Sequence, residues 1–119
     1  MSGGFFAKPE HVPLGELHLR DGEADHRPFR RPWDERRGAL WLQRSTASIA
    51  PRSGIRIQRG EELLQAGPIL VKDGRALCTD DDPEGFRATC DEFDQDITAD
   101  RLPRMAIALA DPWWLAVAS

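Results

Sequence analysis

The sequence has little that would hold it in a membrane or direct it for export. No apolar run approaches the roughly 18 residues that a membrane-spanning helix needs. The opening residues, MSGGFF, lack the charged segment and apolar core of a signal peptide. Taken literally, these absences predict a cytoplasmic protein. An exported protein is the alternative if the chain starts inside a longer gene.

Cysteine and histidine are also scarce. The two cysteines, Cys78 and Cys90, do not form a CxxC pair, and no second pair completes a zinc site. Two free or buried thiols are the simplest interpretation, and a disulfide requires an exported protein. The histidines, His11, His18 and His26, are not spaced as metal ligands. We therefore expect no metal site.

Several enzyme motifs are missing as well. There is no G-x-S-x-G segment, no P-loop and no dinucleotide-binding glycine pattern, so no cofactor is expected. The acidic stretch DDDPEGFRATCD (80–91) approaches a calcium-binding loop. However, its twelfth position is Asp91 rather than glutamate, and its eighth is Arg87 where an apolar residue is usual. A solvated acidic loop is the favoured interpretation.

What the sequence does contain is the composition of one folded domain. Its 119 residues suffice for a single small domain, and 40% hydrophobic with 30% charged residues is ordinary for a globular protein. A net charge of −4 disfavours general binding to nucleic acids or acidic membranes. Arginines cluster in HRPFRRPWDERRG (26–38), with acidic residues among them. We interpret this cluster as a solvated loop, with an anion-binding patch as the alternative.

The hydrophobic pattern mainly predicts strands. Apolar residues alternate with polar ones, or form short runs, in five segments: LGELHLR (14–20), GALWLQR (38–44), GIRIQRG (54–60), RMAIALA (104–110) and WWLAVAS (113–119). The segment GPILVKDGRAL (67–77) predicts a hairpin that turns at Lys72–Arg75. Helical signals are weak and suggest single turns at 60–65 and 84–93. We expect an α+β domain, mainly β in the part present, with a mixed sheet, hairpins and long loops.

Charged residues near the end of the chain are candidates for a functional site. Asp94 and Asp96 stand two positions apart, so in an extended segment they point the same way. Arg104 directly precedes the apolar run that begins at Met105, where its guanidinium could hold an anion through two hydrogen bonds. A structural salt bridge between Arg104 and one of the aspartates is the alternative.

Four segments, in order, resemble the phosphodiester glycosidases related to N-acetylglucosamine-1-phosphodiester α-N-acetylglucosaminidase, which include bacterial exopolysaccharide biosynthesis proteins. They cover nearly the whole chain: SGGFF with PLGELHLRDGE, GALWLQRSTASI, LLQAGPILVKDGR, and FDQDITADRLPRMAIALA. The resemblance implies a hydrolase that acts on a carbohydrate linked to a phosphodiester.

The resemblance also implies that residues 1–119 are part of one domain. In the family, the Gly-Gly-Phe-Phe segment lies inside the domain, and a glycine-rich segment follows the point where this chain stops. A chain without that segment is expected to be inactive by itself. Two positions depart from the family pattern: Ser2 stands in place of asparagine, and Ala108 in place of glycine.

The matching positions imply roles for individual residues. Arg104 would anchor the phosphate or substrate, and Asp96 would supply a carboxylate for acid–base chemistry. Gly3, Gly4 and Gly67 would let the backbone approach the ligand closely. Gln65 would donate or accept a hydrogen bond with a sugar hydroxyl. A non-catalytic carbohydrate-binding or cell-envelope module is the alternative function.

Overall fold

The computed structural model describes residues 5–7, 11–77, 82–86, 105–110 and 113–118, and for 5–7 and 113–118 it describes the backbone. Within these residues the chain is mainly β. The strands are β1 (Phe5–Ala7), β2 (Val12–Leu14), β3 (Leu17–Leu19), β4 (Gly22–Glu23), β5 (Gly38–Leu42), β6 (Ala47–Pro51), β7 (Glu62–Gln65), β8 (Val71–Lys72), β9 (Arg75–Ala76), β10 (Met105–Ala110) and β11 (Trp113–Ala118). The helical elements are α1 (Trp33–Arg36) and the 3-10 turn η1 (Arg52–Gly54).

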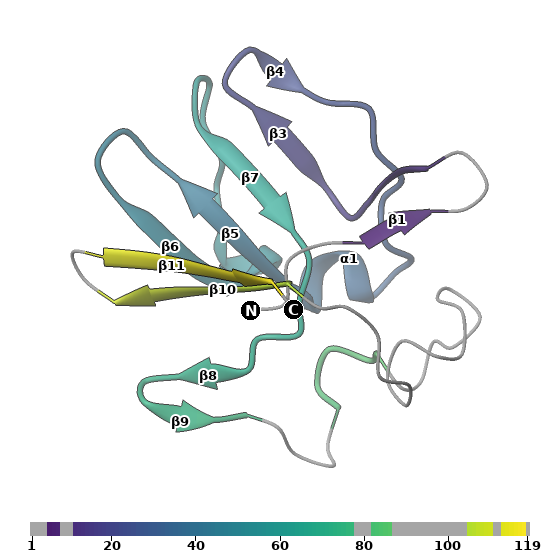
Figure 1. Ribbon diagram of the computed structural model, residues 1–119. Helices are drawn as coiled ribbons and strands as arrows, with labels where there is room; N and C mark the ends of the chain where they lie inside the picture. Colours follow the sequence, from purple (N-terminus) through teal and green to yellow (C-terminus); the bar gives the residue numbers. More distant parts are fainter. Residues whose placement is uncertain (1–4, 8–10, 78–81, 87–104, 111–112, 119) are drawn as a thin grey trace.

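A five-stranded antiparallel sheet forms the centre of the molecule. Its strands lie in the order β4-β3-β7-β5-β6 (Figure 1). β7 lies between β3 and β5, and pairs Leu64 with both Leu17 and Leu40. Three two-stranded hairpins, β1–β2, β8–β9 and β10–β11, complete the described strands. β10 contacts β6, whereas β8–β9 projects from the sheet as a separate arm (Figure 1).

The arm confirms the predicted hairpin. Val71 pairs with Ala76 and Lys72 with Arg75, so the turn is formed by Asp73 and Gly74. Both turn residues have positive φ, 50° and 73°, which is the backbone that a two-residue hairpin turn needs. Asparagine, aspartate and glycine adopt this conformation most readily, which is why the Asp-Gly pair predicted the turn.

Apolar side chains gather in two clusters. Leu14, Phe29 and Phe86 form the first, and Val12 and Trp33 pack against it. The second cluster belongs to the sheet. Its buried members are Ala39, Ile55 and Leu63, flanked by Trp41, Ala50 and Ile57.

Several expectations about the fold need correction. All pairings between named strands are antiparallel, so the described sheets are not mixed. Mainly β structure is confirmed. In the described residues, helix is limited to α1 and η1. The predicted α+β class is therefore not confirmed. Two neighbouring pairs, β3–β4 and β5–β6, are connected by short turns, which antiparallel pairing allows.

Two local predictions were wrong. GIRIQRG forms no strand, although Ile55 is buried and Ile57 half-buried while Arg56 and Gln58 are exposed. Its side chains alternate as predicted, but its backbone finds no partner strand. The expected helical turn at 60–65 is instead β7, because this segment lies between β3 and β5 and pairs with both. Residues 84–86 are not helical, and 87–93 lie outside the described residues.

Candidate functional site

The structure describes two of the six predicted site residues. Gly3, Gly4, Asp96 and Arg104 lie outside the described residues, as do Cys78 and Cys90. Gln65, the last residue of β7, and Gly67, two positions later, are both buried. These two residues belong to different surroundings, which are described in turn below.

The Gln65 side chain joins β7 to two other segments. Its Oε1 accepts a hydrogen bond from the backbone N–H of Glu16 at 3.3 Å, and its Nε2 donates to the backbone oxygen of Asp34 at 2.8 Å. Only 1% of Gln65 is exposed. In this arrangement, Gln65 positions the backbone next to two carboxylate side chains and does not present its amide to a ligand.

A surface depression of about 520 Å³ lies over Gln65. Polar side chains dominate its lining, which comprises Glu16, Glu23, His26, Pro28, Asp34, Glu35, Arg52, Ser53 and Gln65. In the described part of the chain, no group of three or more histidine, cysteine, aspartate or glutamate side chains could hold a metal ion. The depression therefore offers charged and hydrogen-bonding side chains to a ligand that occupies it.

Most of the charge on Glu16 is already neutralised within the depression. Arg52 donates to both carboxylate oxygens, from Nε to Oε2 and from Nη2 to Oε1 at 2.9 Å. His18 Nε2 lies 2.7 Å from Oε1. Partial burial by itself would raise the pKa of Glu16, but the hydrogen bonds from Arg52 and His18 outweigh it and lower that pKa. Glu16 is therefore a charged structural anchor.

Asp34 has unused hydrogen-bonding capacity. Its Oδ1 is buried and accepts no hydrogen bond from the described residues, while its Oδ2 lies 3.7 Å from Arg31 Nε. A buried acceptor without a donor is uncommon, because it loses its hydrogen bonds to water without replacement. Asp34 therefore contributes to the depression a carboxylate with one buried oxygen that lacks a donor among the described residues.

Gly67 faces a different carboxylate. Its φ is +102°, and a Cβ atom at this position would lie 2.7 Å from Oε1 of Glu84. Gly67 therefore lies close to a carboxylate of the same chain, and its predicted approach to a ligand stays a prediction.

Glu84 is bound by two backbone donors. Gly38 N–H donates to Oε1 and Ile69 N–H to Oε2, each at 2.6 Å. Only 6% of Glu84 is exposed. Burial raises the pKa of this carboxyl group, and the two N–H donors and the charge of Arg37 offset part of the increase.

Arg37 holds the backbone of the turn that carries Glu84. Its Nε donates to the backbone oxygen of Glu84 at 3.1 Å, and its Nη2 donates to that of Gly85 at 3.3 Å. The guanidinium lies 4.3 Å from the ring centres of both Phe29 and Phe86. Arg37 is completely buried, so its cation–π contacts and hydrogen bonds replace the water that it loses.

These two residues are buried exceptions within the two segments that we interpreted as solvated loops. The other arginines of 26–38, which are Arg27, Arg30, Arg31 and Arg36, are exposed as expected. Arg37 belongs to the arginine-rich segment that we expected to be solvated, and Glu84 to the acidic one. Each is buried because the turn at Asp82–Phe86 packs Phe86 against Phe29 and brings the two charges inward. Phe29 and Phe86 were the available signals, because an aromatic residue within a charged segment favours burial of its neighbours.

The calcium-loop alternative gains no support from the described positions. Glu84 is engaged by backbone donors, and Asp82 Oδ1 accepts the N–H of Phe86 at 2.8 Å. No helix in the described part of the chain is long and apolar enough to cross a membrane. Comparison with protein-family models, with curated proteins and with solved structures finds no match to this chain.

Proposed function

We propose that this chain is part of a hydrolase that cleaves the bond between a sugar and a phosphodiester. The observation that carries the proposal is the order of the four segments that resemble phosphodiester glycosidases. One of them, LLQAGPILVKDGR (63–75), runs from the second residue of β7 through β8 to the first residue of β9. Its Gly67 has no side chain and lies against a buried carboxylate, so the backbone here tolerates close approach by an anionic group.

In the proposed reaction, water attacks C1 of the sugar, and the bond between C1 and the phosphate oxygen breaks. The products are the free sugar and a phosphate monoester, to which the leaving oxygen stays attached. Arg104 would stabilise the charge on the departing phosphate, and Asp96 would exchange a proton with the water or the leaving group. Both roles follow from the resemblance.

Hydrolysis in water enriched in oxygen-18 tests this proposal. The substrate is N-acetylglucosamine joined through C1 to a phosphodiester, and mass spectrometry follows the phosphate monoester. Cleavage of the sugar–oxygen bond leaves the monoester unlabelled, whereas cleavage at phosphorus labels it. An unlabelled monoester supports the proposal. A labelled monoester, or no turnover by the protein that carries this chain, overturns it.

Two substitutions connect the reaction to the proposed residues. Arg104→Lys keeps the positive charge but loses the paired donors, so turnover should fall at least about tenfold. Asp96→Asn should remove most of the activity. Arg101→Lys is the matched control, because Arg101 lies in the same stretch and has no proposed role. Equal turnover in all three variants would show that Arg104 and Asp96 are not site residues.

A second candidate function is non-catalytic carbohydrate binding. The depression over Gln65 favours it, since polar side chains that include Asp34 and Glu35 line it and sugar hydroxyls donate hydrogen bonds to carboxylates. In this case, the protein binds a monosaccharide saturably without releasing a product. Asp34→Asn should weaken binding, whereas Asp21→Asn, on an exposed turn, should not. Saturable binding without turnover would favour this function over the hydrolase.

A further inference from the structure

The carboxylate of Glu84 occupies a cradle formed by two backbone N–H groups. One donor is Gly38, at the start of β5, and the other is Ile69, just before the β8–β9 arm. Each carboxylate oxygen takes one donor, at 2.6 Å. Such an arrangement recognises a group that carries two terminal oxygens on one atom.

Two glycines make room for this group. A Cβ atom on Gly67 would lie 2.7 Å from Oε1 of Glu84, and one on Gly38 would lie 3.3 Å from the same oxygen. Side chains at these positions would narrow the cradle. Arg37 adds a positive charge beside it and lowers the energy of an anion there. The cradle thus has the donors, the space and the charge that an oxyanion site requires.

A phosphodiester matches the cradle in the same way as a carboxylate. It carries one negative charge and two terminal oxygens on phosphorus, so each oxygen can accept one of the two N–H groups. We propose that Gly38 and Ile69 form an oxyanion cradle for the phosphodiester group of a ligand, and that Glu84 fills it as an internal competitor. The choice of a phosphodiester rests on the proposed function, whereas the cradle itself does not.

In the proposed exchange, the Glu84 side chain rotates out of the cradle while the backbone of its turn stays in place. Arg37 holds the backbone oxygens of Glu84 and Gly85, and Asp82 accepts the N–H groups of both Gly85 and Phe86. The turn therefore keeps its backbone when the Glu84 side chain swings out. Pro68 and Ile69 beside the cradle are half-buried, so the surface is near. A displaced Glu84 regains water while the ligand takes over its two donors.

Two variants of Glu84 test the proposal. Glu84→Ala empties the cradle, whereas Glu84→Met fills it with a side chain of similar length that accepts no strong hydrogen bond. Dimethyl phosphate is the phosphodiester probe, acetate is the carboxylate probe, and sodium chloride at equal ionic strength is the control. Amide NMR follows the N–H signals of Gly38 and Ile69 during each titration.

We expect Glu84→Ala to bind dimethyl phosphate at least tenfold more tightly than the wild type or Glu84→Met. The largest signal changes should be at Gly38 and Ile69. Tighter binding of acetate than of dimethyl phosphate would overturn the phosphodiester assignment. Equal binding by the three proteins, or changes confined to other amides, would overturn the cradle.

If Glu84→Ala does not fold, Glu84→Asp replaces it, because the shorter side chain cannot reach both donors. The same tenfold gain over the wild type is then required, and its absence overturns the proposal. The result is separable from the proposed function. Tight binding in the cradle without hydrolysis contradicts the hydrolase, whereas hydrolysis without such binding contradicts the cradle.

Discussion

Arg37 donates a hydrogen bond from Nε to the backbone oxygen of Glu84, 47 positions later in the chain, at 3.1 Å. This contact joins the residue before β5 to the turn at Asp82–Phe86. The turn also places the Glu84 carboxylate against Gly38, the first residue of β5, and against Ile69, at the base of the β8–β9 arm. A buried ionic group thus determines how three separate segments meet.

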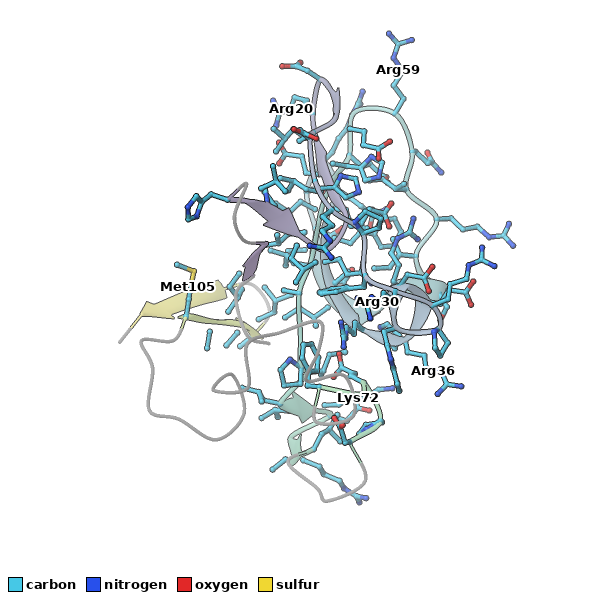
Figure 2. All side chains as sticks on the ribbon, turned by 90° about the vertical axis from the view of Figure 1, so that its right-hand side faces the viewer. Arg20, Arg30, Arg36, Arg59, Lys72 and Met105 are labelled. Carbon is cyan, nitrogen blue, oxygen red and sulfur yellow. The ribbon has the colours of Figure 1, made fainter. Side chains whose placement is uncertain are left out.

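Figure 2 shows Arg20 and Arg59 at the opposite end of the molecule from Lys72, which lies on this arm.

Removing Arg37 should strongly destabilise the fold. Arg37→Met removes the hydrogen bonds that the guanidinium donates to the backbone oxygens of Glu84 and Gly85, and deprives Glu84 of the neighbouring positive charge. We expect the free energy of unfolding in urea to fall by about 3 kcal/mol or more. Arg56→Met, at an exposed position, is the control and should change it by about 0.5 kcal/mol or less. Similar losses in both variants would contradict the structural role of Arg37.

Glu84 and Glu16 should contribute to stability with opposite dependence on pH. The pKa of Glu84 is raised in the fold, so the unfolded chain loses this proton first. Its contribution is therefore fully present below the ordinary value of 4.5 and is lost as pH rises from 4.5 through the raised pKa. The pKa of Glu16 is lowered, so its contribution is present above 4.5 and is lost as pH falls through the lowered pKa.

Urea unfolding of the wild type, Glu84→Gln and Glu16→Gln between about pH 3 and 8 measures both effects. The stability difference between the wild type and Glu84→Gln should shift against the wild type as pH rises. The stability difference between the wild type and Glu16→Gln should shift in favour of the wild type as pH rises. Slopes of the same sign for the two variants would contradict one of the assigned pKa directions.

The turn of the β8–β9 hairpin depends on glycine at position 74. Gly74→Ala places a side chain at a φ of +73°, which should destabilise the arm by about 1 kcal/mol. The Leu77 N–H donates a hydrogen bond to the backbone oxygen of Leu70. Faster hydrogen exchange at this N–H would report the loss of stability in the arm. Gly54→Ala is the control, because Gly54 has no positive φ and open space around it. Unchanged exchange in Gly74→Ala would contradict the observed turn.

Gly67 should tolerate a side chain less well than Gly60. Both have positive φ, +102° and +84°, but a Cβ atom on Gly60 meets nothing within 4 Å. The strained backbone costs about 1–3 kcal/mol at either site. The clash with Glu84 should add about 1–3 kcal/mol for Gly67→Ala alone. Urea unfolding measures both variants.

A double-mutant cycle then identifies the source of the clash. Combining Gly67→Ala with Glu84→Ala should recover part of the additional loss, because the clashing carboxylate is gone. Strictly additive losses would show that Glu84 is not what limits the space at Gly67.

Local patterns predicted much of the β structure. Alternating and short apolar runs indicated β3, β5, β10 and β11, because a half-buried strand imposes a two-residue period on its own sequence. The Asp-Gly pair at 73–74 indicated the hairpin turn, because the conformation that it needs is a property of those two residues. Each of these predictions depends on neighbours in the chain only.

The pairing of strands and the burial of charge were decided by the tertiary structure. Ile55 and Ile57 alternate with polar residues like a strand, yet pair with none, and 62–65 became a strand because β3 and β5 flank it. Arg37 and Glu84 stand in segments as charged as any solvated loop. They are buried because packing of Phe86 against Phe29 brings together donors and acceptors that lie far apart in the chain. Sequence neighbours carry no record of such partners, so only the folded arrangement determines which charged residues lie inside.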